Sequence, residues 1–211
     1  SYTGLENDTF NDLASSVVPF GTTFFWELKT KNTSKCEVAF IDTCFIFKDI
    51  SRNCSFYLQP KKSQDYQLRI SNNFSNDIDS INYRIDLQKD QYPTITFDEI
   101  ADSNYLDYKF FVGEIEDDYG FKKLTFNYSS NKTNTVNSVN VEYQNSNRSS
   151  FGFDFDFGNL NLLDGEEITY YFTVWDNDGI IGPKKTNSQQ LSLKKPNKEE
   201  LKKERETPVS Y

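Results

Sequence analysis

Apolar and polar residues alternate with a period of two along most of the chain. In the first half, the alternation runs through residues 24–29, 66–70 and 81–87, with shorter apolar runs around Phe40 and Phe45. Period two places every second side chain on the same face of an extended segment, so each stretch predicts a half-buried β-strand. Together they predict one small antiparallel sandwich.

The second half carries seven more segments of this kind. They follow an interruption at Gln91-Tyr92-Pro93, where a domain boundary is expected because proline cannot sit inside a central strand. The alternation is clearest in residues 151–157, where four phenylalanines are separated by glycine and aspartate. Seven short strands at near-regular spacing are typical of an immunoglobulin-like sandwich, and a small barrel is the alternative. The expected strands are 95–98, 106–115, 121–128, 136–143, 150–157, 167–175 and 189–193.

We therefore expect an all-β protein with two tandem immunoglobulin-like sandwiches, in residues 1–92 and 93–195. The second half contains no cysteine and lacks the buried disulfide of antibody domains, so fibronectin-like or cadherin-like relatives fit better. Residues 196–211 begin with a run rich in Lys and Glu, in which Pro196 is placed as the first helical residue. This segment is expected to be a short helical or disordered tail.

The composition removes several classes of chemistry. The 211 residues include no histidine, which excludes every catalytic triad, proton shuttle and zinc site that needs an imidazole. Three cysteines cannot complete a zinc site of four thiolates, and the chain has no phosphate-binding Gly-x-x-x-x-Gly-Lys loop. We expect a protein that is not an enzyme.

Net charge and hydropathy exclude further kinds of partner and segment. The chain has 23 Lys and Arg against 32 Asp and Glu, and its net charge of −9 opposes binding to nucleic acid. Its longest apolar runs are far shorter than the ~18 residues of a membrane span, so no transmembrane segment is expected within this stretch. The chain begins without a methionine or a leader, and we interpret it as a piece of a larger protein.

Six segments together carry a family resemblance. They are Tyr-Thr-Gly at 2–4, Val-Pro-Phe-Gly-Thr at 18–22, Lys-Thr-Lys-Asn-Thr at 29–33, Asp-Gln-Tyr-Pro at 90–93, Asp-Asp-Tyr-Gly-Phe-Lys-Lys-Leu at 117–124 and Tyr-Phe-Thr-Val-Trp-Asp-Asn-Asp-Gly at 171–179. Nearly the whole chain resembles the extracytoplasmic part of a family of large, membrane-anchored envelope proteins of unknown function from Bacteroidota, often labelled ATPases. The resemblance implies tandem immunoglobulin-like domains in the periplasm or cell envelope, and it supplies no catalytic residues.

The expected function is accordingly that of a spacer or protein-interaction module of a larger envelope protein, with another envelope protein as partner. The alternative is a carbohydrate-binding or calcium-dependent adhesive module. Tyr171 and Trp175 point away from the face that carries Phe172 and Val174, so they are the candidate residues for an interaction, including stacking on a glycan.

Acidic residues follow two strands of the second half. Asp117 and Asp118 come after its second strand, and Asp176 and Asp178 end its sixth. If successive strands alternate in direction, the two loops share one pole, which is expected to face the domain junction. Carboxylates from several loops are what a Ca²⁺ site requires, but the same sequences form ordinary turns whose Asp side chains accept backbone N–H groups. We favour turns, with no metal and no cofactor.

Two lysines of the first half are expected near the same pole. Lys61 and Lys62 precede the strand that begins near Tyr66, and their charges would neutralise the carboxylates as exposed ion pairs. These lysines are the second candidate interaction set.

The three cysteines, Cys36, Cys44 and Cys54, all lie in the first half. In an oxidising periplasm two of them could pair and leave one over, and the alternative is that all three stay as buried free thiols, because bacteria of this kind need not oxidise every thiol. The sequence does not give the connectivity.

Overall fold

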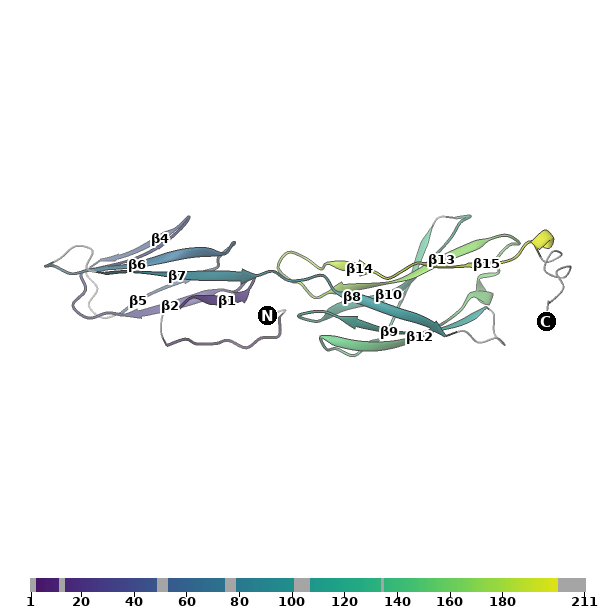
Figure 1. Ribbon diagram of the computed structural model, residues 1–211, viewed down its shortest axis with the longest axis horizontal. Helices are drawn as coiled ribbons and strands as arrows, with labels where there is room; N and C mark the ends of the chain where they lie inside the picture. The colour runs from purple at the N-terminus through teal and green to yellow at the C-terminus, as the bar shows by residue number, and fades with distance from the viewer. Residues whose placement is uncertain are drawn as a thin grey trace, which may run out of the picture. The chain divides into compact units, whose positions relative to one another are not determined.

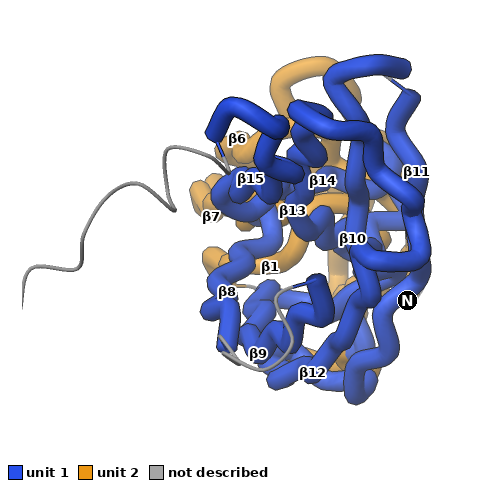
Figure 2. The backbone as a smooth tube through the Cα atoms, turned by 90° about the vertical axis from the view of Figure 1, so that its right-hand side faces the viewer, with its two compact units in different colours: residues 1–4, 91–211 blue, residues 5–90 orange. Residues whose placement is uncertain are grey.

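The computed structural model describes residues 3–11, 14–48, 53–74, 79–100, 107–133 and 135–200. These residues form fifteen strands and divide into two compact units (Figure 2). The N-terminal unit consists of residues 5–90, and the C-terminal unit consists of the described residues from 91 onward together with Thr3 and Gly4. The expected all-β chain of two tandem sandwiches is confirmed, while the domain bounds drawn from the sequence stay predictions.

The N-terminal unit is a sandwich of a five-stranded and a two-stranded sheet (Figure 1). The larger sheet has the order β1-β7-β6-β3-β4, and β2 pairs with β5 in the smaller one. Strand β1 runs parallel to β7, and the other pairs are antiparallel. The strands are β1 (Ser16–Pro19), β2 (Phe24–Lys29), β3 (Lys35–Phe40), β4 (Cys44–Lys48), β5 (Asn53–Leu58), β6 (Gln64–Ser71) and β7 (Asp79–Gln88).

Aromatic rings fill the space between these two sheets. Trp26 stacks between Phe24 and Phe56, with ring centroids 4.9 and 4.8 Å away, and it meets Phe40 and Tyr66 edge to face. Such contacts add to the free energy gained from burying the rings. The alternation seen in the sequence thus places its apolar residues on the inner faces.

Two of the three cysteines belong to this core. Cys36 on β3 and Cys54 on β5 are buried in opposite sheets, and their thiols lie close enough to affect each other's ionisation. Burial and the neighbouring Cys54 raise the pKa of the Cys36 thiol to about 12. Cys44 lies opposite Ala39 on the outer face of the sheet, where it is exposed, and burial and the nearby Glu37 charge raise the pKa of its thiol. Cys36 and Cys54 are therefore neighbours in the core, and Cys44 lies on the other face of its sheet.

Refolding in a glutathione redox buffer should join Cys36 to Cys54 and leave Cys44 as a thiol. The bond would close a short loop between the sheets and raise the free energy of unfolding by about 3 kcal/mol. Alkylation without reductant, followed by peptide mass mapping, checks the pairing, and Cys44→Ser is the control that should keep the bond. A disulfide to Cys44 would contradict the prediction.

The C-terminal unit packs a three-stranded sheet, β12-β9-β8, on a sheet of order β11-β10-β13-β14, in which β15 also pairs with β13 (Figure 1). If β14 and β15 are taken as one interrupted strand, three strands pack against four. The fourth strand, β11, lies at the edge of the larger sheet beside β10, which is a fibronectin-like arrangement. The elements are β8 (Thr94–Ile100), β9 (Tyr108–Glu116), β10 (Phe121–Ser130), β11 (Val136–Asn140), β12 (Arg148–Asp156), a 3₁₀ turn η1 (Phe157–Leu160), β13 (Glu167–Asp176), β14 (Lys185–Asn187) and β15 (Leu191–Lys194).

All seven strands expected in this unit are present, but the last is divided. Thr173 pairs with Asn187 and Tyr170 pairs with Leu191, so four steps along the last strand match three along β13. The extra residue bulges out and separates β14 from β15. The sequence-based strand 189–193 was therefore wrong at its start, because the polar residues of β14 carry no alternation.

The core of the C-terminal unit leaves one inward position without a side chain. Phe111, Phe126 and Phe172 are buried at its centre. Gly113 pairs with Phe151 on β12, and a Cβ atom there would lie 2.5 Å from both the Phe151 ring and the Thr96 carbonyl oxygen. Only glycine fits beneath this ring.

Gly113→Ala should destabilise the C-terminal unit by about 1–3 kcal/mol, because the added methyl group forces both the ring and the neighbouring backbone to move. Urea denaturation followed by fluorescence checks this change. Gly152→Ala is the matched control, since a Cβ atom at Gly152 meets nothing within 4 Å. Equal losses in the two variants would contradict the role of the ring.

The described part of the tail begins a helical turn at residues 198–200. The Asn197 side chain accepts hydrogen bonds from the amides of Glu199 and Glu200, and the Glu200 carboxylate accepts one from the Asn197 amide. This reciprocal pair is a capping box, so the turn begins after Asn197 and not at Pro196. The rest of the expected tail, 201–211, lies outside the described residues. Within the described part of the chain, no helix is long and apolar enough to cross a membrane.

Candidate functional site

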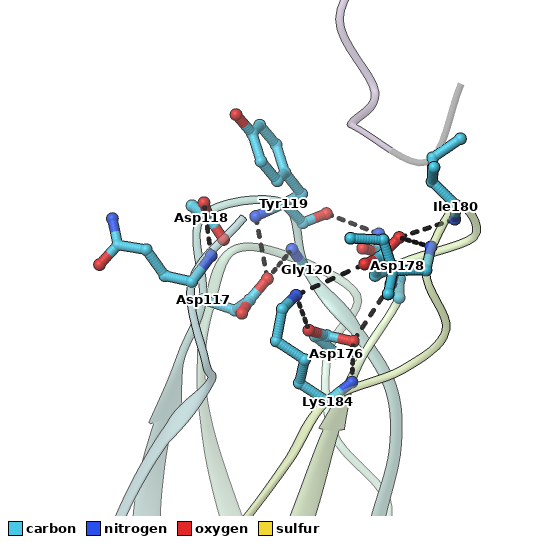
Figure 3. A network of polar contacts seen from close by, with 11 residues as sticks. Asp117, Asp118, Tyr119, Gly120, Asp176, Asp178, Ile180 and Lys184 are labelled. Atoms are coloured by element: carbon cyan, nitrogen blue, oxygen red, sulfur yellow. Dashed lines mark hydrogen bonds and ion pairs between the residues drawn. The ribbon is translucent and has the colours of Figure 1, made fainter. Parts of the chain in front are cut away.

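Two loops of the C-terminal unit bring four acidic residues together (Figure 3). The loop between β9 and β10 carries Asp117 and Asp118, and β13 ends at Asp176, with Asp178 two residues further on. The side-chain amide of Asn177 donates a 2.7 Å hydrogen bond to the Tyr119 carbonyl oxygen and ties the two loops to each other. We call these four carboxylates the acidic cluster.

Lys184 neutralises one half of the acidic cluster. Its Nζ atom lies 2.9 Å from Asp176 Oδ2 and 3.5 Å from Asp178 Oδ2, and both carboxylates are almost fully buried. The other oxygen of Asp176 accepts hydrogen bonds from the backbone amides of Asp178 and Lys184. These bonds close the loop from 176 to 184 around its own cation.

Asp178, like Asp176, accepts hydrogen bonds from backbone amides of the loop. Its Oδ1 atom accepts hydrogen bonds from the amides of Ile180 and Ile181, at 2.7 and 3.1 Å. Burial raises the pKa of this carboxyl group, but the two amides and the Lys184 charge together lower it below its usual value. Asp178 is therefore held in its charged form as a structural part of the loop.

Lys184→Met should reduce the free energy of unfolding of the C-terminal unit by about 3–5 kcal/mol, because it leaves two buried carboxylates without their cation. Urea denaturation followed through Trp175, in a Trp26→Phe background, measures this unit alone. Lys185→Met, at the exposed neighbouring residue, is the control and should change little. A loss below about 0.5 kcal/mol would show that the ion pairs are not needed.

In the part of the chain that the structure describes, the other half of the acidic cluster has no such cation. Asp117 is 7 % exposed, and its Oδ2 atom accepts 2.9 Å hydrogen bonds from the amides of Tyr119 and Gly120. Asp118 Oδ2 accepts a 3.3 Å bond from the amide of Gln91. The Oδ1 atoms of both aspartates are buried without a hydrogen-bond partner, and among the described residues neither carboxylate pairs with a lysine or arginine.

The charges around Asp117 act on its ionisation. Burial, together with the negative charges of Asp118 and Asp176, raises the pKa of Asp117 above its usual value, although its two backbone hydrogen bonds oppose the rise. The folded protein therefore holds a carboxylate whose charge is incompletely compensated.

The lysines singled out in the sequence have partners in the N-terminal unit. Lys62 Nζ lies 3.1 Å from Asp42 Oδ2, and Lys61 Nζ donates a 3.0 Å hydrogen bond to Gln59 Oε1. Sequence reasoning missed Lys184 as the cation of the acidic cluster. Its only signal is its place in the Gly-Pro-Lys-Lys turn, eight residues after Asp176.

Tyr171 and Trp175 lie half-buried on the outer face of β13. Lys123 Nζ sits 5.4 Å from the centre of the Trp175 ring. Asn127, opposite Tyr171, donates a 2.9 Å hydrogen bond to Thr173 Oγ1 between the two aromatic residues. The polar groups of this face are engaged with one another.

The solved structures that are similar to this chain include two distant likenesses. Fibronectin(III)-like modules of CbhA from Clostridium thermocellum align with a TM-score of 0.29 and 12% identity, over 89% of this chain and 92% of that one. The FN1–FN3 domains of chicken CNTN1 align with a TM-score of 0.32 and 10% identity, over 87% and 69%. No protein-family model and no curated protein matches. The strand order of the C-terminal unit, and not these likenesses, identifies its fold as fibronectin-like.

Proposed function

We propose that this chain is a non-enzymatic spacer and protein-interaction module of a larger envelope protein, located in the periplasm or cell envelope, with another envelope protein as partner. The observation that carries the proposal is the exposed aromatic pair on the small sheet of the N-terminal unit. The resemblance to membrane-anchored Bacteroidota envelope proteins supports the location, and the chain contains no phosphate-binding loop to support their ATPase label.

The aromatic pair consists of Phe25 on β2 and Tyr57 on β5. Their ring centroids lie 4.6 Å apart, and the residues are 54% and 67% exposed. Burying large exposed aromatic rings is a main source of affinity in protein interfaces. The pair thus offers a partner an anchor point that Tyr171 and Trp175, which are half-buried, offer less well.

The sheet that carries the pair also has open edges. In the described part of the chain, β2 and β5 hydrogen-bond only to each other, so the outer edge of each strand keeps unpaired backbone groups. A partner strand can add to such an edge and place its own side chains against the aromatic pair.

A photo-crosslinking residue at position 57 of the full-length protein, expressed in its native cell, tests the interaction. We expect a discrete crosslink to an envelope protein that is lost in Phe25→Ser, because that change removes half of the anchor. The same crosslinker at Ile181, which is 73% exposed in the other unit, is the control and should not capture this partner.

Two results would contradict the proposal. One is the absence of any crosslink from position 57 when the protein is expressed at its native level. The other is a glycan-array signal that disappears in Trp175→Ala, which would favour the carbohydrate-binding alternative.

A further inference from the structure

We propose that Asp117 and Asp118 form a binding site for one divalent cation, and that Ca²⁺ is the ion their chemistry fits. The site lies within the C-terminal unit and is independent of the aromatic pair on which the proposed function rests. Asp117 and Asp118 are one half of the acidic cluster, and Lys184 neutralises the other half.

Asp117 and Asp118 place two negative charges close together. A carboxylate oxygen of Asp117 and one of Asp118 lie within 4.8 Å of each other. Like charges at this distance repel, and burial weakens the screening by water. Among the described residues, no lysine or arginine pairs with either carboxylate. The pair is therefore a concentrated negative charge that the surrounding side chains leave uncompensated.

Each of the two side chains also has a carboxylate oxygen that accepts no hydrogen bond. Asp117 is more than nine-tenths buried, and its Oδ1 atom has no hydrogen-bond partner. Asp118 Oδ1 is buried and unpartnered as well. Buried polar atoms in folded proteins almost always have a partner, so an unpartnered acceptor calls for one. A cation between the two carboxylates would give both oxygens a partner and cancel their repulsion.

Backbone hydrogen bonds hold the Asp117 carboxylate in a fixed orientation. The amides of Tyr119 and Gly120 hold Asp117 Oδ2, as Figure 3 shows, which leaves Oδ1 as the oxygen free to bind an ion. Gly120 has φ = +104°, a conformation that side chains disfavour, and it is this turn that directs both amides at one oxygen. The carboxylate is therefore oriented by the fold itself.

The donor atoms select the ion. The chain has no histidine, and its cysteines lie in the other unit, so the site offers oxygen alone. Oxygen ligands are preferred by Ca²⁺ and Mg²⁺, whereas Zn²⁺ favours nitrogen and sulfur. Ca²⁺ takes about six to eight oxygens, more than two carboxylates supply, so water must complete the shell. The expected affinity is that of weak extracellular sites, with Kd about 10⁻⁴–10⁻³ M.

Calorimetric titration of the full chain with CaCl₂, after removal of metal by a chelator, tests the proposal. We expect one Ca²⁺ per chain, and binding at least about tenfold weaker in Asp117→Asn and in Asp118→Asn. The asparagine oxygen can still accept the backbone hydrogen bonds, so each variant removes charge and leaves the turn its acceptor. Asp98→Asn, an exposed residue of β8, is the matched control and should bind like the parent protein.

Thermal melting separates loss of binding from loss of folding. About 10 mM Ca²⁺ should raise the Tm of the C-terminal unit by at least about 4 °C in the parent protein and in Asp98→Asn. Metal-free Asp118→Asn should melt no lower than the metal-free parent, because it relieves the repulsion, and about 10 mM Ca²⁺ should raise its Tm by less than that of the parent. The absence of Ca²⁺ binding in the parent, or binding that persists in both cluster variants, would overturn the proposal.

Discussion

The burial of aromatic rings between two sheets is the interaction on which both units depend. In the N-terminal unit, the rings gather around Trp26, and in the C-terminal unit they gather around Phe126 and Phe172. A chain with 16% aromatic residues and no methionine obtains its apolar volume from large, rigid side chains. Their rigidity demands a matching shape from the backbone, and the empty position at Gly113 beneath Phe151 is one result.

A second requirement follows from how the strands end. Each strand must leave a dry core through a loop whose backbone groups still need partners, and in the C-terminal unit aspartates provide them. These carboxylates also place negative charge in the protein interior, where it needs a compensating positive charge. Lys184 compensates Asp176 and Asp178, and the same requirement, unmet at Asp117 and Asp118, is the basis of the proposed cation site.

The parts of this structure that follow from local pattern were predictable from the sequence. Phe172 and Val174 point into the core because alternation fixes the face on which each residue lies, and the same rule put Tyr171 and Trp175 outside. The bulge that divides the last strand was not predictable, since the polar residues of β14 give no periodic signal. Nor was the pairing of Lys184, because the ion pair depends on how a nine-residue loop folds back, which its composition does not fix. The partners of Lys61 and Lys62 likewise depend on neighbours distant in the chain.

The parallel pairing of β1 with β7 gives the N-terminal unit a particular response to tension. Ser16 to Pro19 lie beside Ile85 to Gln88 in the same direction, so pulling the two ends of the unit apart drags these strands past each other lengthwise. All the hydrogen bonds of the pair then bear the load together, whereas strands peeled from one end would break them singly. The pairing of β1 with β7 therefore resists tension along the chain by shear, with the whole length of the two strands sharing the load.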